Sequence, residues 1–236
     1  MSYLTNPYMV TAGSEPMPVS NPYAHYDASD SSTITESGGY VSVWADLSGN
    51  GYDLIQATGA RQPALIVGGQ NGLDCLDFDY GRNMDTGSAL TALSRSITIA
   101  CVWEIPTNDG SQHFGWSEFL SAPTFSKHDA TNEFSVAFGI TSEVAVSSAY
   151  MGTWRNVTML ALASGVMNLM VGNVLAWSDS CSGSFDPLCI GCHGGMKTNS
   201  PLMWNNAIGE ITIFDRELNV TELTDLNDYY ANKWGL

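Results

Sequence analysis

The stretch AIGEITIFDRELNVTELTDLNDYYANKWGL, residues 207–236, decides the fold, because it combines one strand, one turn and one closing helix. Its first part is a short apolar run of β-branched and aromatic residues, which is typical of a strand: Ile208, Ile211, Ile213 and Phe214. The polar residues 215–217 then end that strand. A strand is therefore expected to lead directly into the last element of the chain.

That last element is expected to be an amphipathic helix with both ends marked. Asn219 is a good N-cap, and Glu222 stands three residues later, as in a capping box. Leu218 and Leu223 have the spacing of a hydrophobic staple, and Gly235 stops the helix. Apolar residues recur along it at intervals of three and four, which places them on one face: Leu223, Leu226, Tyr230 and Trp234.

The rest of the chain is expected to form short strands separated by turns. Strand patterns occur at 40–44, 96–103, 134–140, 155–162, 166–171, 174–177 and 188–191. No helical pattern precedes the last one. This predicts an all-β fold, a two-sheet antiparallel jelly-roll sandwich with a short C-terminal helix. Residues 23–236 would form this single domain, preceded by an extended proline-rich arm at residues 1–22.

The arm holds four of the nine prolines, which remove backbone donors and favour extended backbone. A loose terminus is one interpretation of it. The other is an arm that orders on a neighbouring subunit through apolar anchors, of which we name Tyr3, Leu4, Tyr8 and Met9 as partner-contact candidates.

Two groups of motifs carry a family resemblance. The first group lies near the start and includes DASD at 27–30, WADLSGNG at 44–51 and NGL at 71–73. The second is IGEI, FDREL and KWG in residues 208–235. Together they resemble laminin-G-like jelly rolls of the concanavalin A-like lectin/glucanase superfamily, of the kind found in phage virion proteins. The resemblance implies the sandwich fold and does not specify a reaction.

Composition excludes several classes of partner. Eight Lys and Arg stand against 24 Asp and Glu, a net charge of −16, which disfavours nucleic acid and anionic membranes. The N-terminus lacks the pattern of a signal peptide. Of the five cysteines, Cys75 and Cys101 are expected to be buried thiols. Cys189, Cys192 and His193 have one spacing typical of metal ligands, but no second pair accompanies them, and a zinc site needs about four ligands.

Two acidic groups are candidates for chemistry. Glu210 and Asp215 could form the carboxylate pair of a glucanase. They are five residues apart, however, and in a regular strand such residues point to opposite faces. The alternative interpretation is that both are solvated acids at the end of a strand. Oxygens of Asp46, Ser48, Asn50 and Asp53 could hold calcium, as laminin-G-like relatives often do. Asn and Asp also serve turns, and we favour the turn, with no cofactor.

Residues 104–133 form a long polar insertion with aromatic side chains, which we interpret as a loop and a candidate contact surface. Phe114, Trp116 and Phe119 are the partner-contact candidates there. The rival interpretation is that these aromatics plug one end of the sandwich.

Together with the resemblance, these features give a first hypothesis of a non-enzymatic virion structural protein. It would be a capsid decoration protein or a head or tail fibre component. It would contact capsid or tail subunits and form a homo-oligomer, with a trimer favoured. The alternative is a lectin-like module for host glycans, with stacking on Trp116, Tyr150 and Trp204. A glycoside hydrolase is the third hypothesis.

Overall fold

The computed structural model describes the chain in several segments. These are residues 16–78, 82–86, 93, 96–105, 112–115, 123–128, 133–138, 143–147, 153–180, 189–190 and 207–236. In the segments from 112 to 147, and at 189–190, only the backbone course of the strands is described.

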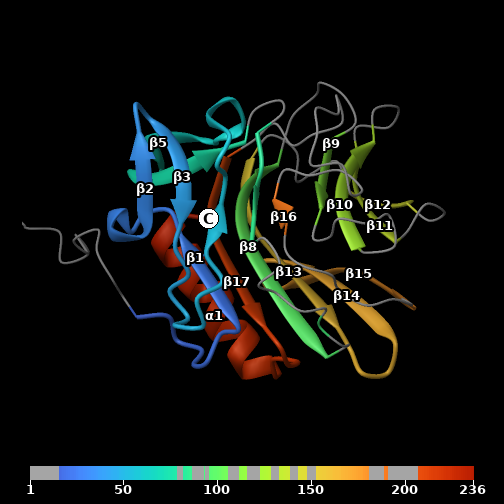
Figure 1. Ribbon diagram of the computed structural model, residues 1–236. Coiled ribbons are helices and arrows are strands. Elements are labelled where there is room, and N and C mark those ends of the chain that lie inside the picture. Colours follow the sequence, from blue (N-terminus) through green and yellow to red (C-terminus); the bar gives the residue numbers. More distant parts are fainter. Residues whose placement is uncertain are drawn as a thin grey trace, which may run out of the picture.

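Antiparallel β-structure dominates these segments (Figure 1). The main sheet runs in the order β15 (Val174–Ser180), β14 (Val166–Val171), β13 (Thr153–Ala161), β8 (Ile97–Ile105), β17 (Ala207–Phe214), β6 (Leu73–Asp77), β5 (Ala64–Gln70), β3 (Tyr40–Trp44), β4 (Leu54–Ile55), β7 (Met84–Asp85) and β16 (Cys189–Ile190). Two strands join it off this path, β1 (Ala24–Asp27) on β17 and β2 (Ile34–Ser37) on β3. A smaller sheet has the order β12 (Glu143–Ser147), β11 (Glu133–Phe138), β10 (Pro123–His128) and β9 (Gln112–Gly115).

Strand β17 is the centre of the fold, as its apolar pattern predicts. All eight of its residues are buried. It pairs with β8 along one side, and with β1 and β6 along the other. A register shift at Gly209 keeps Ile208 and Ile211 on the same face although they are three positions apart.

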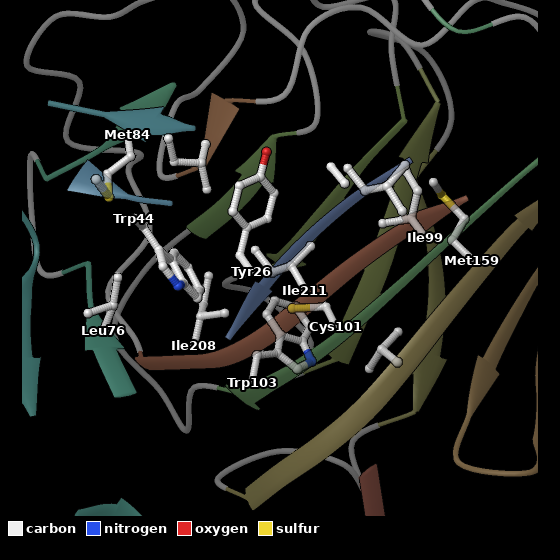
Figure 2. Packing of buried hydrophobic residues seen from close by; sticks show 14 of the residues in the cluster. Tyr26, Trp44, Leu76, Met84, Ile99, Cys101, Trp103, Met159, Ile208 and Ile211 are labelled. Atoms are coloured by element: carbon white, nitrogen blue, oxygen red, sulfur yellow. The ribbon is translucent and has the colours of Figure 1, made fainter. Parts of the chain in front are cut away.

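The interior of the sandwich is filled by side chains from both halves of the curled main sheet (Figure 2). Ile99, Cys101 and Trp103 of β8 point into it, which confirms the alternation expected for residues 96–103. Trp44 of β3 and Met84 of β7 enter from the opposite layer. The predicted all-β sandwich is therefore confirmed.

Helix α1 (Val220–Trp234) covers the outer face of the sheet (Figure 1). The apolar face predicted for it, Leu223 to Trp234, packs in a second buried cluster with Phe214 of β17 and Val102 of β8. The predicted capping box is present, because Asn219 and Glu222 cap each other's backbone N–H groups. Gly235 adopts a left-handed conformation with φ 68° and ends the helix.

Two shorter helical turns, η1 (Ser31–Thr33) and η2 (Gly59–Arg61), are of the 3-10 type. No helix in the described segments is long and apolar enough to cross a membrane.

The expectation of a loop at residues 104–133 is wrong, since β9 and β10 lie within it and pair with each other. These two strands were not recognised in the sequence because strands are identified by alternating apolar residues, and polar residues interrupt that alternation in β9 and β10. At the other end of the chain, Val19 of the expected arm is only 3% exposed and packs under α1 with Met17 beside it. The division into an arm and a domain at residue 22 stays a prediction.

Candidate functional site

A connected group of charged side chains surrounds Glu210, on the face of β17 that meets α1. Glu210 is fully buried, and four donors surround its carboxylate. Its Oε1 atom lies 2.8 Å from His25 Nε2 and 3.1 Å from Tyr229 Oη. Its Oε2 atom lies 2.7 Å from Lys233 Nζ and 2.9 Å from Trp234 Nε1. Both oxygens are therefore fully used by the protein itself.

A second carboxylate completes this group. Asp27 stands directly opposite Glu210 in the β1–β17 pairing, and its Oδ2 atom lies 2.5 Å from Lys233 Nζ. Lys233 thus bridges two strands from the last turn of α1. We call Glu210, Lys233, Asp27, His25 and Tyr229 the Glu210 network.

The pKa directions in the Glu210 network follow from burial and charge. Burial alone would raise the pKa of Glu210, but the bond from His25 and the charge of Lys233 outweigh it, and the pKa lies below its ordinary value. Burial, followed by the charge of Glu210, raises the pKa of Asp27. Burial works to lower the pKa of Lys233, but the two carboxylates raise it overall. Lys233 is thus held charged between them.

These contacts show what the Glu210 network can do. Glu210 has no exposed surface and no free lone pair, so it cannot reach the oxygen of a glycosidic bond. The interpretation of Glu210 as a solvated acid is wrong, while Asp215 is exposed as expected. The network fastens α1 to the sheet. Sequence reasoning missed His25, Asp27 and Lys233 as its members, although Lys233 stands in the terminal motif.

The loop between β3 and β4 uses its acidic side chains to hold its own backbone. Asp46 Oδ1 accepts from the N–H groups of His25 and Ser48, each at 2.9 Å. Asp46 Oδ2 accepts from Ser48 Oγ at 2.6 Å and from the N–H of Tyr52 at 3.1 Å. Asp53 Oδ1 in turn accepts from the N–H of Asp46. These oxygens serve the turn, and the described segments contain no group of three or more His, Cys, Asp or Glu residues placed to hold a metal ion.

Two tyrosine rings stack beside this loop. The rings of Tyr23 and Tyr52 have centroids 4.8 Å apart and planes at 30°. Both rings are half-buried and pack against the edge of the sandwich interior. Leu47, 42% exposed, lies in the same loop as Tyr52. We call the stacked rings of Tyr23 and Tyr52 the tyrosine platform; the sequence analysis named neither of these two tyrosines as a site residue.

The other predicted site residues are placed only in part. Phe114 lies on β9, where the backbone alone is described. The remaining contact candidates lie outside the described residues, as do the suggested sugar-stacking residues: Tyr3, Leu4, Tyr8, Met9, Trp116, Phe119, Tyr150 and Trp204.

The cysteine expectations are met where the structure describes them. Cys75 and Cys101 are free, buried thiols. Burial raises the pKa of Cys75 to about 12, so this thiol is a poor nucleophile at neutral pH. Of the zinc candidates, Cys189 lies on β16, and Cys192 and His193 lie outside the described residues.

Comparison with solved structures defines the class of fold. Trypanosoma rangeli sialidase in complex with the inhibitor DANA is similar with a TM-score of 0.58 and 15% identity, over 89% of this chain and 33% of the sialidase. A GH54 α-L-arabinofuranosidase soaked with a cyclic sulfate inhibitor gives 0.61 and 12%, over 83% and 51%. The HCR/D W1238A mutant gives 0.57 and 12%, over 86% and 53%. At these identities the likeness shows the fold alone.

The chain spans about a third of the sialidase and about half of the arabinofuranosidase that it matches. No protein-family model and no curated protein matches the sequence. The fold is thus an antiparallel β-sandwich that also occurs as one part of longer carbohydrate-active proteins.

This comparison corrects the expected function. The sequence motifs led to a non-enzymatic virion structural protein, but two of the three similar structures compared above are glycoside hydrolases, a sialidase and an arabinofuranosidase. None of the three is named as a virion protein. The motifs therefore identified a sandwich shared by many proteins, and the step from that fold to a virion rested on analogy.

Proposed function

We propose that this chain is a carbohydrate-binding, lectin-like β-sandwich module. The observation that carries the proposal is the tyrosine platform, where two stacked and partly exposed rings stand at the edge of the sandwich beside a loop rich in hydrogen-bonding groups. Aromatic surfaces with a few well-placed polar groups are the usual lining of small-molecule sites. The similarity of the fold to parts of carbohydrate-active proteins supports a sugar as the ligand.

The tyrosine platform is held in place before any ligand arrives. Tyr26 Oη donates to the carbonyl of Tyr52 at 2.5 Å, and the carbonyl of Tyr23 accepts from Asn50 Nδ2 at 3.0 Å. Asp46 binds the N–H of Tyr52, and the N–H of Tyr23 donates to Ile213 of β17 at 2.7 Å. Both backbones are thus fixed by bonds from neighbouring elements. Such preorganisation lowers the entropy cost of binding.

Binding without cleavage is the second part of the proposal. Of the two acids of the suggested glucanase pair, Glu210 is buried between β17 and α1. Its carboxylate is hydrogen-bonded to His25, Lys233 and Trp234. A glycosidase needs two carboxyl groups that both reach the scissile bond. The chain would therefore hold a glycan for another protein or domain to use.

The test is calorimetric titration of the full chain with a panel of uncharged oligosaccharides, repeated with Tyr23→Ala and Tyr52→Ala. We expect each substitution to weaken binding about fivefold, because a lost stacking contact costs about 1 kcal/mol. Tyr40→Ala is the matched control, since Tyr40 is an exposed ring elsewhere, under the guanidinium of Arg82. Circular dichroism checks that each variant is folded.

Two results would count against the proposal. Absence of binding to the whole panel at millimolar ligand would remove the carbohydrate assignment. Release of reducing sugar that disappears in Glu210→Gln, with folding intact, would show that the chain is a hydrolase.

A further inference from the structure

The surroundings of the tyrosine platform are acidic. The pKa of Tyr52 lies above its ordinary value, first because its hydroxyl is hydrogen-bonded to Tyr23, and then because of burial and the nearby charges of Asp46 and Asp215. Burial, followed by the charges of Asp46 and Asp53, also raises the pKa of Tyr26, whose hydroxyl donates to the carbonyl of Tyr52. By geometry, Asp46 binds the N–H of Tyr52, and the strand that ends next to Asp215 accepts the N–H of Tyr23.

The position of Asp215 follows from the strand pairing. The N–H of Tyr23 donates to the carbonyl of Ile213, and Asp215 follows two residues later, where β17 has ended. Its side chain is exposed to solvent. Asp46, in contrast, is partly buried and has both oxygens engaged by the loop. Of Asp46, Asp53 and Asp215, only Asp215 is exposed to solvent, so its charge is the one most open to a ligand near this end of β17.

The nearest basic residue in the sequence does not balance this charge. Arg216 follows Asp215 directly, but its guanidinium is turned to Glu222, with two bonds of 2.9 Å and 2.8 Å. The chain as a whole carries a net charge of −16. A sugar carboxylate placed here would meet like charge, and Arg216, the basic residue next to Asp215 in the sequence, is already paired with Glu222.

We propose that the tyrosine platform binds uncharged glycans and discriminates against glycans that carry a carboxylate, such as sialylated ones. This inference rests on the proposed carbohydrate-binding function and adds the class of sugar. The expected ligand therefore differs from sialic acid, the ligand bound in one of the similar Trypanosoma rangeli sialidase structures. Repulsion by Asp46 and Asp215 is the source of the specificity.

The experiment titrates the full chain with a matched pair of ligands, lactose and 3′-sialyllactose, at low and at high salt. We expect the sialylated sugar to bind about tenfold more weakly at low salt, and the gap to shrink when salt screens the carboxylates. Asp215→Asn should narrow the gap to about threefold by removing one of the charges. Asp225→Asn removes an equal charge from the exposed face of α1 and should leave the gap unchanged.

The outcomes separate the two proposals. If both sugars bind equally well, or if Asp225→Asn narrows the gap as much as Asp215→Asn, the discrimination by the tyrosine platform is wrong while carbohydrate binding stands. If neither sugar binds, and no oligosaccharide of the uncharged panel binds either, the proposed carbohydrate-binding function is wrong, and so is the inference that rests on it.

Discussion

The Nζ atom of Lys233 lies 2.7 Å from the Oε2 atom of Glu210, in the interior between helix α1 and strand β17. Glu210 is inaccessible to solvent, and the Lys233 side chain is only 19% exposed. The same ammonium group also binds Asp27 of β1. One side chain in the last turn of the chain therefore joins the C-terminal helix to two strands, one of which lies near the start.

The first prediction concerns this lysine. Lys233→Met should lower the free energy of unfolding by about 3 kcal/mol, because it leaves two carboxylates close together without a counter-charge. Arg216→Met is the matched control, since it breaks an ion pair whose arginine is 38% exposed, where less than about 1 kcal/mol is expected. Urea denaturation of both variants gives the comparison. Equal losses would show that Lys233 has no special role.

The second prediction concerns the close approach of α1 to the sheet. A Cβ atom added at Gly209 would lie 2.6 Å from Cη2 of Trp234, a distance that real Cβ contacts do not show. Gly209→Ala should therefore cost about 1–3 kcal/mol, through overpacking under a buried indole ring. Gly59→Ala is the control, because nothing lies within 4 Å of a Cβ there. The melting temperature of each variant measures the difference.

A second variant separates the clash from other effects at Gly209. In the background Trp234→Leu, the smaller side chain leaves room for the added methyl group. Gly209→Ala should then cost less than it does beneath tryptophan. An unchanged cost would show that the indole ring is not the obstacle.

The terminal helix could be predicted from the sequence because its signals are local. Asn219, Glu222 and Gly235 act within one or two turns of their own positions, and the structure confirms each role. The Glu210 network could not be predicted in the same way. His25 and Glu210 are 185 residues apart, and only the pairing of β1 with β17 brings them together. Strand parity also did not say that Glu210 faces a buried interior, while Asp215 follows the end of β17 and is exposed.

The tyrosine platform shows the same limit. Tyr23 and Tyr52 stand on separate loops, and their stacking depends on Asp46, which binds the N–H groups of His25 and Tyr52. The sequence marked Asp46 as an acid in a turn, and that was correct. It did not show which aromatic rings the turn would bring together.

The third prediction concerns acid stability, where two carboxylates of the Glu210 network should act in opposite directions. The pKa of Glu210 in the folded protein lies below 4.5, so the unfolded chain takes up the proton first. Its contribution is present above pH 4.5 and is lost as the pH falls through the lowered pKa. The pKa of Asp27 lies above 3.8, so the folded protein takes up the proton first, and stability falls as the pH rises through that window.

Unfolding experiments between pH 3 and pH 7 check this with two isosteric variants. The stability advantage of the wild type over Glu210→Gln should shrink as the pH falls. Its stability relative to Asp27→Asn should instead improve over the same range. Parallel trends for the two variants would contradict the opposite pKa shifts.

The fourth prediction concerns Asn227, a buried polar residue on the apolar face of α1. Its Oδ1 atom accepts from Asn156 Nδ2 of β13 at 3.0 Å, and its Nδ2 atom donates to the carbonyl of Gly172 at 3.0 Å. Asn227→Ala would leave the buried Asn156 amide and the partly buried carbonyl of Gly172 without this bond, and a lost bond costs about 1–3 kcal/mol for each group that stays buried. We expect a total loss of about 3 kcal/mol, since water can reach the Gly172 turn and satisfy part of the deficit.

Asn232→Ala is the control for this substitution, because Asn232 is exposed on the same helix. Replacing it should change the stability by no more than about 0.5 kcal/mol, and alanine is the better helix former. Chemical denaturation measures both variants, and hydrogen exchange at the N–H of Gly172, which bonds the carbonyl of Asn156, reports on the turn itself. Faster exchange there in Asn227→Ala alone would locate the loss at the contact between α1 and the turn from β14 to β15. Unaltered exchange, together with a small loss of stability, would mean that Asn227 is not the residue that holds the helix to this turn.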